Sequence, residues 1–412
     1  MPPLAIPTGA TALNEILAHP AVRRLRAAAH ETDTQTVDEQ VALAGIPAPT
    51  FHESERGAYV AARFAALGLA DVHTDAVGNV VARLPGSPAA DSGQVVVAAH
   101  LDTVFPAGTD TRATRTADGR ILAPGITDNC RGLAAMLAVA RLLAAEGART
   151  EGPLLFAATV GEEGSGDLRG VKHLFAEGGE LRGAGAFVAL DGSGVRRIVT
   201  RAIGSRRLRV EVTGPGGHSW ADRGTPNPIA ALGRTAAALA GMSLPSPARS
   251  SLTVARMGGG TSINAIPDAA WMEIDIRSEV PGALAEIEAA VRRHLQRGVA
   301  AENAHRRPAD RPLATAVTLI GDRPSGETRG NDPLVRAALQ ATEAIGERAE
   351  LAASSTDANL PISLGIPAIC IGAGGDSGGI HTPEEWYRND GGAAGVERAL
   401  LVLLAAAGLA AG

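Results

Sequence analysis

A histidine and an aspartate stand directly after an apolar run in the segment VVVAAHLD, residues 95–102. The β-branched residues predict a strand buried in a parallel sheet, and open α/β sheets place their sites at the carboxyl ends of such strands. Alternation along an extended segment puts His100 and Asp102 on one face. A carboxylate beside a histidine can orient the imidazole for metal binding. A buried histidine beside a capping aspartate accounts for the pair at least as well.

Two further acidic positions follow the same pattern. Asp128 comes just before a long apolar helix, where it could instead be the N-cap, as could Asn129. Glu162 and Glu163 directly follow an apolar strand, and adjacent carboxylates repel each other unless cations or solvent compensate. As a solvated pair they would be unremarkable, but after a buried strand they favour a metal site.

Asp191 and His381 complete the set of candidate ligands. Asp191 ends another apolar strand, where an Asp-Gly pair is also a turn signal, and His381 follows a Gly-rich loop. The segment SSTDAN, residues 354–359, precedes a predicted buried strand and is equally consistent with a pocket lining and a plain turn. Each position alone has an ordinary structural explanation, but their joint occurrence at predicted strand ends indicates a metal-binding site.

The order and spacing of these residues resemble the M20 family of metallopeptidases and amidohydrolases, from about residue 35 onward. The resemblance implies that His100 and Asp191 hold one metal ion and that Glu163 and His381 hold the other, with Asp128 bridging. It implies two divalent cations, for which we expect zinc. Cobalt or manganese could substitute, because imidazole and carboxylate ligands suit all three metals.

The resemblance also implies roles for two residues that are not ligands. Asp102 would orient His100, and Glu162 would be the general base for a water that two metal ions activate to attack an amide carbonyl. In the family an aspartate more often precedes the glutamate pair, whereas Gly161 stands here. This departure touches no ligand, but it weakens assignment to any one subfamily.

The segments around these residues alternate between predicted strands and helices. Strands near 95–100, 154–160 and 186–190 alternate with helical patterns at 132–146 and 168–177. This alternation predicts an α/β fold with a mostly parallel sheet and helices on both faces, and the resemblance implies the zinc-peptidase type.

The pattern changes after Asp191 to alternating strands and two helices, one of them over 281–298. Two helices on one face of an antiparallel sheet form a compact α+β unit. The resemblance makes this a ferredoxin-like lid and dimerisation domain. We therefore expect a catalytic domain in two parts interrupted by an insert, with boundaries at residues 1–201, 202–324 and 325–412.

The insert carries three candidate substrate-binding residues. His218, in VTGPGGHSW, could be a surface histidine by composition alone. The resemblance implies that it steadies the developing oxyanion, often from the partner subunit. Asn264 and Arg277 match family positions that bind a substrate carboxylate, which a guanidinium can grip bidentately. The alternative for Arg277 is an exposed charge at a strand end.

Composition excludes several other classes of function. The chain has 412 residues, a net charge of −6 and no basic block, so we expect no nucleic-acid partner. Two cysteines are too few for a disulfide framework. The N-terminal segment lacks the features of a signal peptide, and the apolar stretches are too short or too charged to span a bilayer. We expect a cytoplasmic protein without a membrane partner.

The sequence as a whole predicts a metal-dependent hydrolase that cleaves the amide bond of small peptides. The segments GEEGSGDLRGVKHLF and GGHSW resemble those of peptidase T-like aminopeptidases, which implies a di- or tripeptidase. The alternative is an N-acyl amino acid deacylase or carboxypeptidase of the same family. A non-catalytic peptide-binding homologue is less favoured, because every ligand and base position is filled. The resemblance also implies a homodimer formed through the insert.

Overall fold

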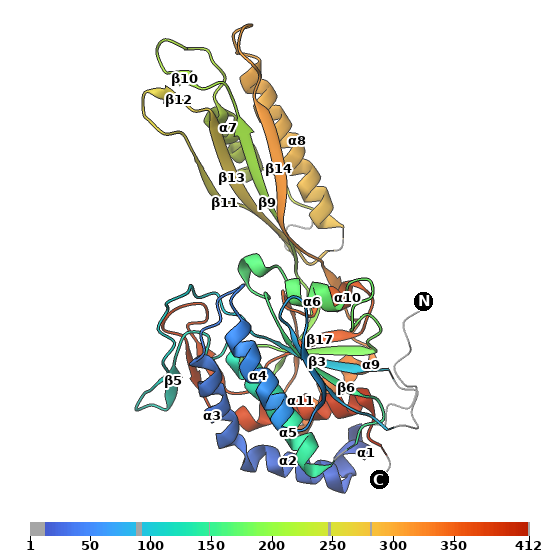
Figure 1. Ribbon diagram of the computed structural model, residues 1–412. Helices are drawn as coiled ribbons and strands as arrows, with labels where there is room; N and C mark the ends of the chain where they lie inside the picture. The colour runs from blue at the N-terminus through green and yellow to red at the C-terminus, as the bar shows by residue number, and fades with distance from the viewer. Residues whose placement is uncertain (1–12, 88–92, 148, 246–248, 281, 411–412) are drawn as a thin grey trace. The chain divides into compact units, whose positions relative to one another are not determined.

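The computed structural model describes residues 13–87, 93–147, 149–245, 249–280 and 282–410. The chain forms two compact units (Figure 1). Unit 1 comprises Met1–Ala202 and Glu327–Gly412, and unit 2 comprises Ile203–Gly326. Unit 1 is therefore discontinuous in sequence, and unit 2 is inserted between its two parts.

Within the described residues, unit 1 is built on a nine-stranded sheet with the order β1-β2-β6-β3-β7-β17-β8-β15, in which β16 also pairs with β8. The central strands β6, β3, β7 and β17 run parallel to one another. This confirms the predicted mostly parallel sheet. The strands are β1 (Ala70–Thr74), β2 (Val80–Leu84), β3 (Val95–His100), β6 (Leu154–Thr159), β7 (Ala186–Leu190), β8 (Arg197–Ala202), β15 (Gly326–Glu327), β16 (Glu350–Ser354) and β17 (Ala368–Ile371).

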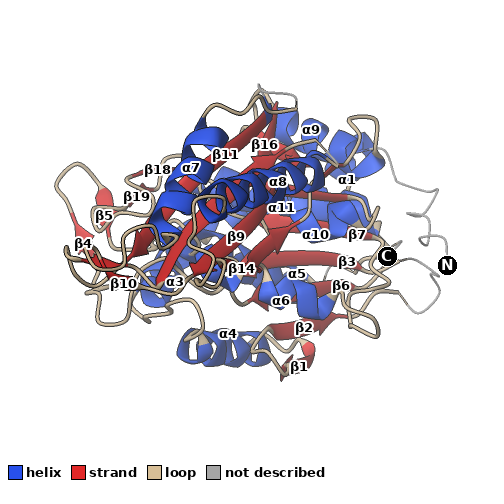
Figure 2. Cartoon of the chain, turned by 90° about the horizontal axis from the view of Figure 1, so that it is seen from above, coloured by secondary structure: helices blue, strands red, loops and turns tan. Residues whose placement is uncertain are grey.

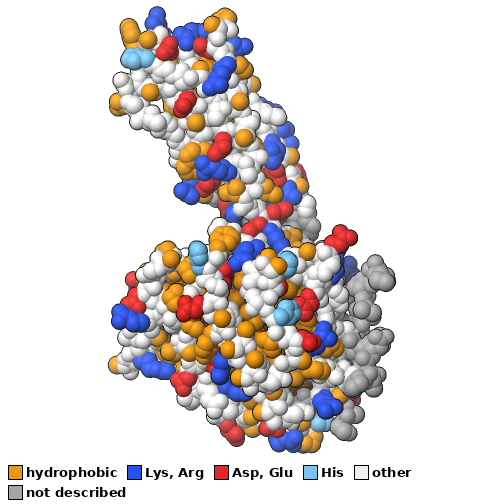
Figure 3. Space-filling view, in the orientation of Figure 1, with side chains coloured by type: hydrophobic (Ala, Val, Ile, Leu, Met, Phe, Trp, Pro, Cys, Tyr) orange, Lys and Arg blue, Asp and Glu red, His pale blue; other side chains and the backbone are white. Residues whose placement is uncertain are grey.

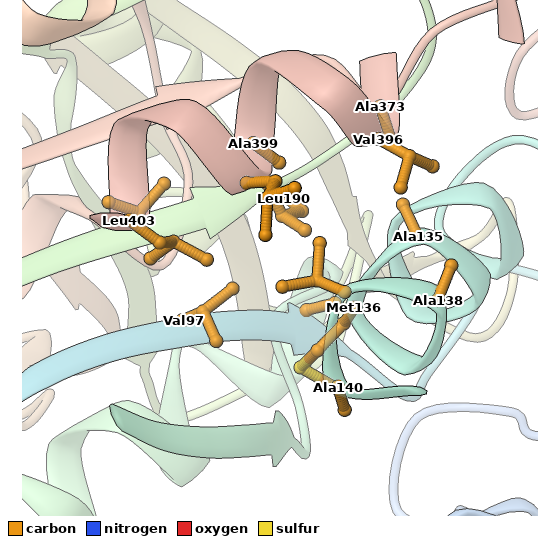
Figure 4. Packing of buried hydrophobic residues seen from close by; sticks show 14 of the residues in the cluster. Val97, Ala135, Met136, Ala138, Ala140, Leu190, Ala373, Val396, Ala399 and Leu403 are labelled. Atoms are coloured by element: carbon orange, nitrogen blue, oxygen red, sulfur yellow. The ribbon is translucent and has the colours of Figure 1, made fainter. Parts of the chain in front are cut away.

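Both faces of this sheet are buried. In β3, Val95 and Val97 face one apolar core, and Val96 and Ala98 face the other. Met136 packs in the first core, with Val97 (Figure 4). The first core is closed by α1 (Leu13–Ala18), α2 (Pro20–Glu31), α3 (Asp33–Ala44), α4 (Ser54–Ala66), α5 (Cys130–Glu146), α9 (Pro333–Ala344) and α11 (Gly392–Ala407), and the second by α6 (Arg169–Leu174) and α10 (Asn359–Ser363). Helices thus cover both faces, as a sheet with two apolar faces requires.

A second, small sheet in unit 1 is absent from the sequence prediction. Its strands have the order β18-β19-β5-β4 and run antiparallel. The strands are β4 (Thr114–Arg115), β5 (Arg120–Leu122), β18 (Asp376–Gly378) and β19 (Trp386–Arg388). Strands this short carry too few residues to show an alternating pattern. Through the pairing of β5 with β19, the sheet nevertheless joins two segments that are more than 250 residues apart in the chain.

The helix predicted over 168–177 is shorter than expected, since α6 runs from Arg169 to Leu174. Leu168 has a φ of 60°, in the left-handed region, so the helix cannot include it. In the described part of the chain, no helix combines the length and apolar character needed to cross a bilayer.

Unit 2 contains a four-stranded antiparallel sheet with the order β11-β13-β9-β14 in its described residues. Apart from the short pair β10 (Gly217–His218) and β12 (Ala265–Ile266), its strands and helices follow each other in the chain as β-α-β-β-α-β, which is the ferredoxin-like arrangement that was expected. Figure 2 shows the helices and strands seen from above. The elements are β9 (Gly204–Thr213), α7 (Pro228–Ala240), β11 (Ser250–Gly259), β13 (Ala269–Ser278), α8 (Ala283–Asn303) and β14 (Ala314–Arg323).

The two faces of this sheet differ in character. Met272 and Ile274 of β13 are buried with Leu232 of α7 and Ile287 of α8. The alternate residues of β13 and its neighbours carry charges, among which Glu273 accepts from the guanidinium of Arg209 at 2.8 Å. On the face drawn in Figure 3, basic and acidic side chains are interspersed. The alternation in β13 therefore gives this sheet one buried and one polar face.

Candidate metal centre and active site

The candidate ligands of unit 1 converge because their strands are neighbours. His100 is the last residue of β3, Glu162 and Glu163 follow β6, and Asp191 follows β7. The three strands are parallel and adjacent, so their carboxyl ends meet at one edge of the sheet. His100, Glu162 and Glu163 are all buried there.

Asp128 lies between the two histidines, with one carboxylate oxygen towards each. Its Oδ1 atom is 3.0 Å from His100 Nε2, and its Oδ2 atom is 3.1 Å from His381 Nε2. The remaining acidic residues flank this row, with Asp191 Oδ1 3.8 Å from His100 Nε2 and Glu163 Oε1 3.0 Å from His381 Nε2. Three groups of three possible ligands result, namely His100 with Asp128 and Asp191, Asp128 with Glu163 and His381, and His100 with Glu162 and Glu163. The first two groups share the Asp128 carboxylate.

Each group is compact enough for one cation. In each of these groups, one ligand atom from every residue lies within 4.8 Å of the others. The buried Oδ1 atom of Asp128 has no hydrogen-bond partner among the described residues, although the His100 ring is beside it. A buried carboxylate oxygen without a hydrogen bond is costly unless another positive group satisfies it. Imidazole and carboxylate donors therefore fit divalent metal ions here, zinc, cobalt and manganese among them.

The helix-cap explanation for Asp128 is wrong, because its neighbour fills that role. The side chain of Asn129 accepts a hydrogen bond from the backbone N–H of Gly132 at 3.1 Å and is the N-cap of α5. The Asn129 amide also donates to the carbonyl of Leu190 at 2.9 Å. That bond fixes the start of α5 against the end of β7, next to Asp191. The Asp128 carboxylate is consequently left to face the histidines.

Asp102 is fully buried and connects two strand ends. Its carboxylate accepts from the backbone N–H groups of Glu162 and Glu163 at 2.9 and 3.0 Å, and from the hydroxyl of Thr50 at 2.8 Å. Burial raises the pKa of Asp102, but His100 and the hydrogen bonds from Glu163 and Thr50 together lower it by more. The pKa therefore falls below its usual value of 3.8. Asp102 thus remains a carboxylate that holds the glutamate pair in place.

The His100 ring is oriented chiefly by the backbone of Asp102. Its Nδ1 atom lies 3.0 Å from the carbonyl oxygen of Asp102 and 3.5 Å from the carboxylate. A hydrogen bond from Nδ1–H to a carbonyl fixes the tautomer and presents Nε2 to the ligand group. The predicted orienting partner is the same residue, but its main chain is the closer group.

Glycine at position 161, where the sequence resemblance led us to expect an aspartate, has a steric explanation. Its φ is 65°, and a Cβ atom there would lie 2.6 Å from Cγ of Arg169. The Arg169 guanidinium in turn donates to the buried carboxylate of Glu53 at 2.7 Å. A side chain at position 161 would therefore collide with a held arginine and strain the backbone.

The two histidines are strongly affected by the surrounding carboxylates. Hydrogen bonds to Asp128 and Glu163 raise the pKa of His381 to about 10, against the opposing effect of burial. Burial lowers the pKa of His100, but Asp102, Asp128 and Asp191 together raise it well above 6.5. In the metal-free protein the carboxylate cluster is therefore balanced by protonated imidazoles.

This balance predicts a pH dependence of stability for the metal-free protein. The folded pKa of His381, about 10, exceeds the unfolded value of 6.5, so its stabilising contribution is complete below 6.5 and is lost as the pH rises through 10. The melting temperature of chelator-treated protein should fall as the pH is raised from about 7 to about 8.5. Differential scanning fluorimetry measures this directly.

His381→Asn is the matched control, because it removes the titrating ring. The melting temperature of this variant should fall less between pH values of about 7 and about 8.5 than that of the wild type. Metal-loaded wild type should also lose less stability over the same interval, since a coordinated ring nitrogen carries no proton. A melting temperature of the metal-free wild type that stays constant or rises over this interval would contradict the prediction.

The three candidate residues of the insert lie in unit 2. His218 is exposed in the short strand β10 (Gly217–His218), and its ring Nδ1 accepts from the backbone N–H of Trp220. Asn264 is also exposed, and its carbonyl accepts from the backbone N–H of Ser219 at 3.0 Å, so His218 and Asn264 lie on adjoining segments. Arg277 is in β13, where its Nε atom donates to Asp275 at 2.7 Å.

Two buried carboxylates near the ligands were not predicted as site residues. Asp357, within SSTDAN, accepts from the hydroxyl of Thr159 at the end of β6, and burial raises its pKa to about 6. Glu385 is fully buried, and burial raises its pKa although three backbone N–H groups oppose the rise. The sequence offers only weak signals for either, namely an Asp in a possible pocket lining and a second Glu after His381.

Comparison with known proteins agrees with this geometry. The sequence pattern of the family described as "Peptidase family M20/M25/M40" matches residues 96–405. Aminopeptidase PepT from Bacillus cereus ATCC 10987 has a similar structure, with a TM-score of 0.72, 24% identity and coverage of 90% of this chain and 98% of that one. A tripeptidase from Staphylococcus aureus subsp. aureus Mu50 is also similar, with a TM-score of 0.75, 22% identity and coverage of 90% of this chain and 98% of that one. No curated protein matches the sequence.

The YxeP protein of Bacillus subtilis, described as a dinuclear metal binding peptidase from the M20 family, is also similar. Its TM-score is 0.64 at 20% identity, over 90% of this chain and 97% of that one. These structural likenesses establish the fold, and the family match covers all the candidate metal ligands.

Proposed function

Because this chain belongs to the peptidase family M20/M25/M40, we propose that it is a metal-dependent hydrolase that cleaves the amide bond of small peptides, as a di- or tripeptide aminopeptidase does. His100 and Asp191 would hold one divalent ion, Glu163 and His381 would hold the other, and Asp128 would bridge them. We expect zinc, with cobalt or manganese as possible substitutes.

The placement of Asp128 between two imidazoles is the observation that carries the proposal. Its two oxygens face different histidines at 3.0 and 3.1 Å, and each histidine has a second carboxylate beside it. Each imidazole therefore has two carboxylates beside it, one of its own and one that is shared, as two cations joined by one bridging carboxylate would require.

Glu162 is the proposed general base. Bound metal ions would lower the pKa of a water molecule and polarise the amide carbonyl. Glu162 would take the proton of the attacking water and pass it to the departing amine. Because Asp102 accepts from the N–H groups of both Glu162 and Glu163, the base and the adjacent ligand are held at a fixed spacing. Such positioning is what lets a carboxylate act at one defined atom.

Unit 2 would contribute to substrate binding. We propose that His218 stabilises the developing oxyanion and that Asn264 and Arg277 bind a substrate carboxylate. The same family membership supports a role for unit 2 as a lid and as the contact between two subunits of a homodimer. We further propose a cytoplasmic location.

Product analysis on defined substrates tests the function. The purified enzyme with added zinc, cobalt or manganese is incubated with tripeptides, with the same peptides blocked at the N-terminus, and with N-acetyl amino acids. An aminopeptidase releases the first residue only from the unblocked peptides. Release of acetate from the N-acetyl amino acids, without cleavage of tripeptides, would instead identify a deacylase and refute the peptidase assignment.

A further inference from the structure

Glu385 is a fully buried carboxylate that holds the loop carrying the central ligand Asp128. Its Oε1 atom accepts from the backbone N–H groups of Thr127 and Asp128 at 2.8 and 3.0 Å, and its Oε2 atom accepts from that of Gly125 at 3.0 Å. Three donors from one turn therefore converge on one side chain. One of them is the main chain of Asp128 itself.

The same residue also belongs to the segment that carries His381. Its backbone N–H donates to the carbonyl of Thr382 at 3.1 Å, and its own carbonyl accepts from the N–H of Ala123 at 3.1 Å. The next residue, Trp386, pairs with Leu122 in the small sheet. Main-chain and side-chain contacts of Glu385 thus join the Asp128 loop to the His381 loop.

Only an ionised carboxylate can satisfy these donors completely. A carboxylate offers acceptors at both oxygens, whereas the isosteric amide of glutamine replaces one acceptor with an N–H₂ donor. In Glu385→Gln, one backbone N–H group would face another donor in a buried place. The turn would have to shift to avoid that contact. A shift there moves Asp128 relative to His381.

We propose that Glu385 is a positioning residue that sets the metal affinity of the group formed by Asp128, Glu163 and His381. Two of this group's three ligands, Asp128 and His381, lie on loops that Glu385 contacts, whereas His100 and Asp191 are placed by the ends of β3 and β7. Loss of Glu385 should therefore weaken this group more than the one that contains His100 and Asp191. The inference rests on the proposed two-metal function.

Titration of the metal-free full-length protein with Zn²⁺ or Co²⁺ tests the proposal, with a competing chelator to resolve two binding steps. Relative to wild type, Glu385→Gln should bind one of the two ions about 10- to 100-fold less tightly, as loss of a supporting contact typically does. The adjacent Glu384 is exposed, so Glu384→Gln makes the same chemical change one residue away and should retain wild-type affinity. Equal affinities for the two variants in both steps would overturn the proposal.

A second variant covers the case in which Glu385→Gln does not fold. Glu385→Asp keeps both acceptor oxygens but is one methylene shorter, so its affinity should fall between those of wild type and the glutamine variant. If only the aspartate variant folds, wild-type affinity in both steps would overturn the proposal. Circular dichroism of the metal-free proteins establishes folding before titration.

Metal affinity and peptide hydrolysis are independent measurements. If wild type binds two ions and Glu385→Gln weakens one of them, but no peptide is cleaved, the inference stands and the proposed substrate class fails. If peptides are cleaved and both binding steps are unchanged in Glu385→Gln, the function stands and the inference fails.

Discussion

Glu162→Ala is expected to keep both metal ions and to lower kcat on a cleavable peptide by about 10²- to 10⁴-fold, the range typical for removal of a general acid–base group. The expectation follows from the proposed roles, in which Glu162 is the base beside the ligand Glu163 and is not one of the five ligands, although its carboxylate lies close enough to the ligand atoms of His100 and Glu163 to be a possible ligand. Its backbone N–H bond to Asp102 does not involve the side chain, so the truncation keeps this contact.

Steady-state kinetics and metal analysis of the same preparation decide the outcome. Glu177 is exposed, and Glu177→Ala provides a matched truncation that should change neither quantity. Near-normal turnover in Glu162→Ala would show that another group is the base. Loss of metal in that variant would instead place Glu162 among the ligands.

Asp128→Ala should have the broadest effect of any single ligand substitution, since it removes the only carboxylate proposed to contact both ions. We expect metal content to fall below one ion per chain and activity to fall to background. His381→Ala should retain about one ion, because the other group keeps His100 and Asp191. Inductively coupled plasma mass spectrometry of dialysed protein measures the stoichiometry.

Asp38, exposed in α3, supplies the control, and Asp38→Ala should retain two ions and full activity. The bridging assignment fails if Asp128→Ala and His381→Ala each retain one ion. The two-metal proposal itself fails if wild type holds fewer than one divalent ion per chain and added zinc, cobalt or manganese restores no activity.

The parts of the fold that were predictable from the sequence are those with strong local patterns. The apolar runs before His100, Glu162 and Asp191 are strands buried on both faces, and such runs need no knowledge of their neighbours. The carboxyl ends of parallel strands meet at one edge, so the convergence of these residues followed from the strand assignment. The helices of the insert were also predictable, because their apolar residues repeat with a local helical period.

Other features depend on contacts that no local pattern encodes. The pairing of β5 with β19 and the hydrogen bonds that the Asp128 loop donates to Glu385 connect positions about 260 residues apart. The choice between Asp128 and Asn129 as helix cap depends on which of the two side chains faces the histidines, and that is Asp128. The requirement for Gly161 comes from Arg169, which a helix brings back against the strand end.

The discontinuity of unit 1 has a consequence for biosynthesis. Strand β17 lies between β7 and β8 in the sheet, yet it is made after the whole of unit 2. While the ribosome translates the insert, the nascent sheet lacks this central strand, and the apolar surface that α11 will cover stays open. Four of the five proposed ligands have been synthesised by then, but His381 has not. Chaperone protection is therefore most needed in that interval, because exposed apolar surface and unpaired strand edges promote aggregation.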